Sequence, residues 1–204
     1  MIFLGLFIFL LFLLAYFRKK NSNAQSTVEE DFWARENEAN HTRRQDISGL
    51  PYITIPLENF PMGIYDNSEL MEYEELLTNL SHEKILNLEG ESNTDLKLKY
   101  GPANLDALTA CDDNYATLCR TIVSYAECLL SLSHRQDAQK VLETGISCGC
   151  DHSKNYLLLA DLYLEDHNEA SFENLLRQAE ALTSPGRDSI LKRLSDKKAA
   201  FEPS

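Results

Sequence analysis

The residues best suited to chemistry are two thiols and an imidazole within five positions, in the run Cys148-Gly149-Cys150-Asp151-His152. Thiolate and imidazole ligands hold zinc and other soft metals, and neighbouring thiols can carry redox chemistry. A closed zinc site takes four ligands, commonly from two loops, and the sequence has no second Cys/His cluster. Cys148, Cys150 and His152 are therefore weak metal candidates. The alternative is an interhelical loop with incidental thiols.

Other patterns that carry chemistry are missing from the sequence. It has no G-x-S-x-G turn, no H-E-x-x-H pair and no phosphate-binding G-x-x-x-x-G-K-[ST]. The five cysteines are an odd number, which does not suit a complete disulfide framework. We therefore expect a non-enzymatic protein with no catalytic residue and no cofactor.

The charge balance excludes one class of partner. The chain has 204 residues, with 32 Asp and Glu against 19 Lys and Arg, for a formal net charge of −13. Nucleic-acid binding needs clustered cations, so we expect no nucleic-acid partner. Another protein or peptide, which the sequence does not identify, is the expected partner.

The N-terminus differs from the rest of the chain. Residues 1–17 read MIFLGLFIFLLFLLAYF and carry no charged side chain, and Arg18, Lys19 and Lys20 follow. Seventeen residues of helix rise roughly 25 Å, at the short end of what crosses a bilayer. Basic residues only after the apolar run place residues 18–204 in the cytoplasm. We expect residues 1–20 to anchor a single-pass membrane protein in the lipid bilayer. A cleaved signal peptide and a buried helix remain alternatives.

The soluble part divides into three segments. Residues 21–45 are a linker and a charged juxtamembrane helix, on which Trp33 is a candidate contact for a partner protein or a membrane surface. The alternative is that Trp33 docks on its own domain. Residues 46–113 are an irregular segment with short strands and helices. They include extended pieces at Tyr52–Ile55 and Ile85–Leu88.

Residues 114–204 are predicted to form helical hairpins, because apolar residues recur there at helical spacing. The segments 114–132, 134–147, 153–165, 168–182 and 187–200 are the expected helices. Upstream, we expect helices over 67–82, over a short stretch capped by Thr94 that ends near Tyr100, and over 103–110. Asp112-Asp113-Asn114 is expected to cap the helix that follows.

An offset of 34 residues overlays two of these hairpins. The matched pairs are Tyr125 with Leu159, Ala126 with Ala160, Leu129 with Tyr163, Leu142 with Leu176, and Gly145 with Ala179. The pattern resembles the tetratricopeptide repeat over about residues 119–185. Four features depart from that family: no Trp opens either unit, Phe172 stands at a small-residue position, Ser133 and His167 replace the turn glycine, and Cys150 and Ser184 replace the loop proline.

The resemblance implies a mainly α fold, a short stack of helical hairpins whose first helices line a concave groove that binds a peptide or helix. By that resemblance the groove residues are Arg120, Val123, Glu127, Leu130, Lys154, Leu157, Asp161 and Leu164. A plain antiparallel bundle is the alternative, in which these residues contact neighbouring helices. We therefore expect a membrane-anchored adaptor or scaffold with a cytoplasmic interaction domain. A metal or redox protein and a structural subunit of a membrane complex are the alternatives.

Overall fold

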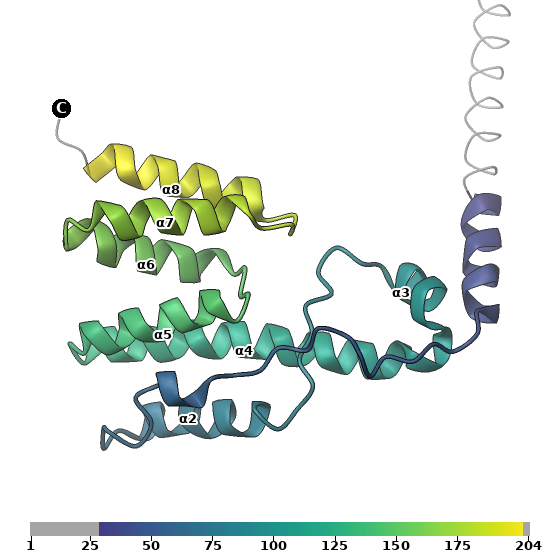
Figure 1. Cartoon of the computed structure of the whole chain (residues 1–204), viewed down its shortest axis with the longest axis horizontal. Coiled ribbons are helices and arrows are strands. Elements are labelled where there is room, and N and C mark those ends of the chain that lie inside the picture. The colour runs from purple at the N-terminus through teal and green to yellow at the C-terminus, as the bar shows by residue number, and fades with distance from the viewer. Residues whose placement is uncertain (1–28, 202–204) are drawn as a thin grey trace, which may run out of the picture. The chain divides into compact units, whose positions relative to one another are not determined.

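The computed structural model describes residues 29–201, and these form two compact units: residues 29–47 with 92–105, and residues 48–91 with 106–201. Eight α-helices and two short 3-10 turns make up the regular structure of this range, which contains no β-strand (Figure 1). The expectation of a mainly α fold is confirmed. The expected anchor, residues 1–20, lies outside the described residues. Among the helices from residue 29 onward, none is both long and apolar enough to cross a bilayer.

The smaller unit pairs a helix over residues 29–41 with α3 (Asn93–Tyr100). We expected Thr94 to cap α3, but it does not. Ser92 does, in a capping box with Asp95 in which each side chain bonds the other residue's backbone N–H. Thr94 instead donates a hydrogen bond of 2.7 Å to Glu36 on the first helix, and Lys97 forms an ion pair with the same carboxylate. Polar contacts thus join the two helices.

A glycine allows the chain after α3 to pack against Arg43 and Arg44, which follow the first helix. Gly101 has a φ of 87°, and a Cβ there would lie 2.7 Å from the Arg44 Cα. Beyond it, the 3-10 turn Pro102–Asn104 buries the Asn104 side chain, whose amide donates to the carbonyl oxygens of Gln45 at 2.8 Å and Tyr100 at 2.7 Å. The Asn104 side chain thus satisfies two backbone carbonyl groups that no β-sheet pairs.

The larger unit is a succession of antiparallel helices. It contains the 3-10 turn Leu57–Asn59 and six helices: α2 (Ser68–Leu80), α4 (Leu105–Ser131), α5 (Arg135–Ser147), α6 (Ser153–Glu165), α7 (Glu169–Glu180) and α8 (Arg187–Phe201). Figure 1 shows α5, α6, α7 and α8 in successive layers, with α4 beside α5 and α2 on the other side of α4. Each helix after α4 begins and ends within two residues of its expected bounds.

Helix α4 corrects one expectation. Two helices were expected over 103–110 and 114–132, with Asp112-Asp113-Asn114 as the cap between them, but α4 runs unbroken through residues 105–131. The polar side chains serve the loop after α2 instead. Asp112 accepts a bond of 2.9 Å from the Leu88 N–H, and the Asn114 amide donates to the Lys84 carbonyl at 3.1 Å. Neither Gly nor Pro interrupts this stretch, so the helix has no reason to stop.

The two extended pieces lie side by side but do not form a strand pair. The Ile53 N–H donates to the Ile85 carbonyl at 2.9 Å. The next N–H groups of the second piece turn to α4, where Leu86 donates to the Cys111 carbonyl at 3.2 Å. Pro51 and Pro56 flank the first piece and have no N–H to donate. The expected short strands are therefore wrong, although the expected juxtaposition is present.

The turns that end α4 and α6 are alike. Ser133 (φ 66°) and His167 (φ 52°), which stand 34 positions apart, both adopt the left-handed conformation. The following residues close the same pair of bonds, from His134 N–H to the Leu129 carbonyl and from Asn168 N–H to the Tyr163 carbonyl, both at 2.8 Å. The two hairpins therefore share their turn geometry although neither turn contains glycine.

Candidate interaction face

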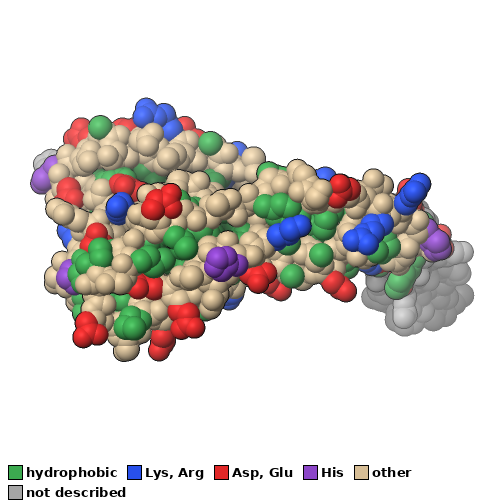
Figure 2. Space-filling view, turned by 60° about the horizontal axis from the view of Figure 1, so that its bottom comes forward, with side chains coloured by type: hydrophobic (Ala, Val, Ile, Leu, Met, Phe, Trp, Pro, Cys, Tyr) green, Lys and Arg blue, Asp and Glu red, His purple; other side chains and the backbone are tan. Residues whose placement is uncertain are grey.

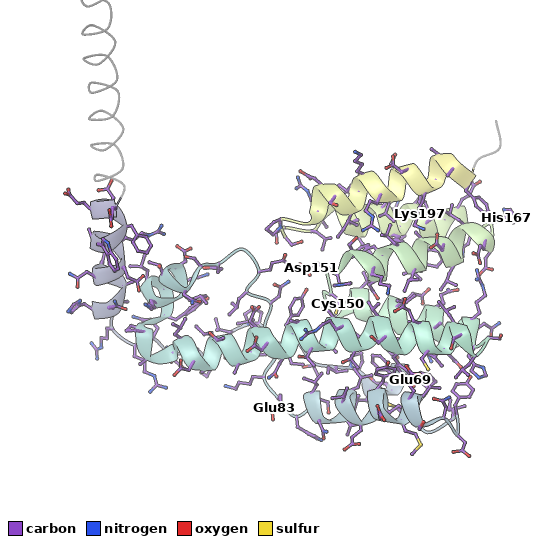
Figure 3. All side chains as sticks on the ribbon, turned by 180° about the vertical axis from the view of Figure 1, so that it is seen from behind. Glu69, Glu83, Cys150, Asp151, His167 and Lys197 are labelled. Atoms are coloured by element: carbon purple, nitrogen blue, oxygen red, sulfur yellow. The ribbon has the colours of Figure 1, made fainter. Side chains whose placement is uncertain are left out.

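Helices α4, α6 and α8 lie on one face of the stack and are joined by side-chain contacts. The Glu127 carboxylate on α4 and the Lys154 ammonium on α6 form an ion pair of 2.6 Å. Asp161 on α6 pairs with Lys197 on α8, and Arg193 on α8 donates to the Ser153 hydroxyl at 2.7 Å. We call this surface the α4/α6/α8 face. Figure 3 labels Lys197 between α8 and α6.

The eight groove residues expected from the sequence differ in burial and in charge pairing on this face. Val123 and Leu157 are buried. Leu130 and Leu164 are half-buried and pack against the core. Glu127, Lys154 and Asp161 form ion pairs within the face. Arg120 is exposed, and its guanidinium Nε donates to the Ala116 carbonyl of its own helix at 3.1 Å. Arg120 is thus the expected groove residue most available to a partner.

A hollow of about 530 Å³ opens at the end of the face where α6 and α8 begin. Residues of α4, α6, α8 and the loops after α2, α5 and α7 line it: Glu89, Asp112, Tyr115, Ala116, Cys119, Arg120, Asp151, His152, Ser153, Gly186, Ser189, Ile190 and Arg193. In Figure 3, Asp151 lies at this end of α6, and His167 lies at the other. The lining therefore includes three carboxyl groups, of Glu89, Asp112 and Asp151, and two guanidinium groups, of Arg120 and Arg193.

Two carboxyl groups, Glu89 and Asp151, are joined by a hydrogen bond at the hollow. Asp151 accepts a hydrogen bond of 2.7 Å from the Tyr115 hydroxyl. Burial raises the pKa of Asp151, but hydrogen bonds from Glu89 and Tyr115 outweigh burial and leave that pKa below its ordinary value. The hydrogen bond to Asp151, with lesser effects of burial and of the Asp112 charge, raises the pKa of Glu89 to about 7. Below about pH 7, Glu89 therefore carries the proton and donates it in a hydrogen bond to the Asp151 carboxylate.

This pair predicts a pH dependence of stability. The pKa of Glu89 is about 7 when folded and 4.5 as the ordinary value, so the folded protein binds more protons in this interval. The contribution is full below pH 4.5 and is lost as pH rises through about 7. Glu89→Gln keeps a donor at every pH. We expect guanidinium unfolding to show the free energy of unfolding declining more steeply from pH 5 to 8 in the wild type than in Glu89→Gln. Glu83→Gln, on the same loop, controls for loss of one charge, and a wild-type profile parallel to that of Glu89→Gln would contradict the assignment.

The expected metal candidates are not brought together. Cys148 and Cys150 are buried, while His152 is exposed beside the start of α6. Cys150 makes a hydrogen bond with Cys119 of α4, and this bond and burial raise the pKa of the Cys150 thiol well above its ordinary value. In residues 29–201, no group of three or more His, Cys, Asp or Glu side chains is arranged to hold a metal ion. These thiols lie in the core of the hairpin junction.

Trp33 belongs to the smaller unit and lies on its surface. Its side chain is 60% exposed, and Phe32 beside it is 54% exposed. The two rings pack edge to face, with centroids 5.4 Å apart and planes at 75°. The smaller unit itself therefore leaves most of both rings uncovered.

Sequence reasoning missed most of the hollow. Glu89, Asp112 and Asp151 come from three separate segments, so no local motif could have grouped them. Arg193 lies on α8, beyond residues 119–185 that carry the repeat resemblance. The 34-residue offset could have aligned α8 with α6, since it places Arg187 where α6 has Ser153. No family model matches the chain, and no curated protein or solved structure matches it in the comparisons.

Proposed function

We propose that the chain is a membrane-anchored, non-enzymatic adaptor. Residues 1–20 hold it in the bilayer, and the tetratricopeptide-like larger unit, on the cytoplasmic side, docks a segment of another protein. The observation that carries the proposal is the hollow on the α4/α6/α8 face. Concave sites with a few convergent polar groups are the usual place for a ligand. An anchored adaptor raises the effective concentration of its partner at the membrane.

Charge pairing within the face supports the end at which we propose that the partner binds. The Glu127–Lys154 and Asp161–Lys197 ion pairs satisfy four of the charged side chains of the face. Arg120 and Arg193 border the hollow, and within the described part of the chain neither forms an ion pair with a carboxylate. Arginine is enriched at the energetically dominant positions of interfaces. These two guanidinium groups are the proposed contacts for an acidic side chain of the partner segment.

A matched pair of charge reversals tests this proposal. A photo-crosslinking amino acid replaces Ser189, an exposed residue of the hollow, in cells that contain the partner. We expect a discrete crosslinked adduct that Arg120→Glu reduces at least about tenfold, equivalent to about 1.4 kcal/mol, and that Arg177→Glu leaves unchanged. Arg177 is an exposed cation on α7, away from the face. Equal yields in both variants, with unchanged circular dichroism, would contradict docking at the hollow.

A further inference from the structure

The aromatic pair Phe32 and Trp33 forms an exposed apolar patch on an otherwise polar helix. Over residues 29–41 only Ala39 is buried, so the helix covers little of its own unit. Phe32 lies one turn before Glu36, whose carboxylate bonds Thr94 and Lys97 of α3, but α3 leaves the Phe32 ring more than half exposed. Two large rings packed edge to face and more than half exposed are costly to leave in water.

The position of the pair in the chain indicates what covers it. Eleven residues separate Lys20, the end of the basic run, from Phe32. Even fully extended, twelve steps of chain reach only about 40 Å. If residues 1–17 are held in the bilayer, Phe32 and Trp33 stay within that distance of the headgroups. Tryptophan is favoured at this interface, where an apolar ring system and a polar N–H are both accommodated.

The distribution of charge between the two units also favours the membrane surface as the cover of this aromatic pair. The smaller unit carries five Lys and Arg against seven Asp and Glu over residues 29–47 and 92–105. The larger unit carries eleven against twenty-four over residues 48–91 and 106–201. Figure 2 shows acidic side chains scattered over the surface of the helical stack. With Arg18, Lys19 and Lys20 added, the N-terminal part is close to neutral, so headgroups repel it far less than they repel the larger unit.

We infer that Phe32 and Trp33 insert into the membrane interface beside the anchor, so that the smaller unit rests on the lipid surface. The inference rests on the proposed anchoring by residues 1–20. Glu29 and Glu30 lie about one turn before the rings, and they make a zwitterionic surface more suitable than a strongly anionic one. Interfacial helices bury their apolar side chains about 5–10 Å deep at the boundary of headgroups and acyl chains.

The composition of the chain makes the inference directly measurable. Trp33 is the single tryptophan of the protein, so all tryptophan emission reports on this position. The full chain is reconstituted into phosphatidylcholine vesicles with or without lipids brominated high on the acyl chains. We expect brominated lipid to reduce the emission at least about twofold at interfacial depth, and aqueous iodide to have little effect.

A lone tryptophan placed elsewhere supplies the control. In Trp33→Phe/Arg177→Trp, the indole lies at an exposed position of α7 in the larger unit, and we expect iodide but not brominated lipid to quench it. In Phe32→Trp/Trp33→Phe, the indole moves by one residue and should again be quenched by brominated lipid.

Flotation of the same vesicles separates the possible failures. If the chain floats but Trp33 is quenched by iodide alone, the anchor stands and the inference is wrong. If the chain floats and neither quencher reaches Trp33, protein covers the pair, and the inference is again wrong. If the chain does not float, the anchoring itself is wrong, and the inference fails with it.

Discussion

Phe172→Ala is expected to lower the free energy of unfolding of the larger unit by about 3–5 kcal/mol. The Phe172 ring on α7 is 1% exposed, and the Lys198 ammonium of α8 lies 5.8 Å from its centroid. Truncation removes the buried ring and leaves a cavity that the surrounding helices fill only in part. Thermal unfolding followed by circular dichroism should show a midpoint lower by about 6–20 °C, since 1 kcal/mol corresponds to about 2–4 °C in a chain of this size.

This prediction opposes the expectation from the repeat pattern alone. Phe172 aligns with Ala138 of the preceding hairpin, and tetratricopeptide-like units favour a small residue there. A small cavity of about 180 Å³ already borders the ring, between Tyr163, Leu164, His167 and Phe201. Alanine would enlarge that space rather than improve the packing. Phe172→Leu keeps much of the volume and should cost about 1–1.5 kcal/mol. A loss below 1 kcal/mol for Phe172→Ala would show that the helices close on a small residue, as the repeat pattern implies.

The regular part of the fold was predictable because it depends on short-range patterns. Apolar spacing predicted α5 to α8 within two residues at each end, since each of these helices buries one stripe against its neighbours. The same local reasoning failed at α4, where Asp112 and Asn114 could cap a helix or could bond a distant loop. Sequence spacing does not distinguish these roles. The Leu88 N–H that Asp112 binds lies 24 residues earlier in the chain.

The candidate site was predictable to a smaller extent, for a related reason. The tetratricopeptide resemblance implied that Arg120, Glu127, Lys154 and Asp161 share one face, and each lies on α4 or α6. Whether Asp161 is available to a partner depends on α8, because Lys197 of α8 forms an ion pair with Asp161. The Glu89–Asp151 pair depends on two loops that meet only after the helices have packed. The proposed specificity of the site therefore arises from tertiary contacts that leave no local signal.

Gly145→Val is expected to lower the free energy of unfolding by about 2–3 kcal/mol, because α4, α5 and α6 meet at this glycine. A Cβ at Gly145 would lie 2.8 Å from the Ile122 Cγ2 atom and 3.3 Å from both side-chain polar atoms of Asn155. Ile122 and Asn155 are fully buried, so neither side chain can move aside without disturbing the core. The Asn155 amide also donates to the Leu142 carbonyl at 3.1 Å, a bond that displacement of α5 would strain.

A double-mutant cycle assigns the cost to this contact. Ile122→Ala alone should destabilise by about 2–5 kcal/mol, since it leaves a cavity. In that background the added valine finds space, and we expect Gly145→Val to cost at least about 1 kcal/mol less than in the wild type. Gly186→Val is the matched control, because a Cβ there would meet nothing within 4 Å. Additive effects at Gly145 and Ile122 would contradict the contact. Coupling between them, with Gly186→Val near neutral, would locate the cost of the valine at the meeting point of the three helices and identify Gly145 as the residue that permits their close approach.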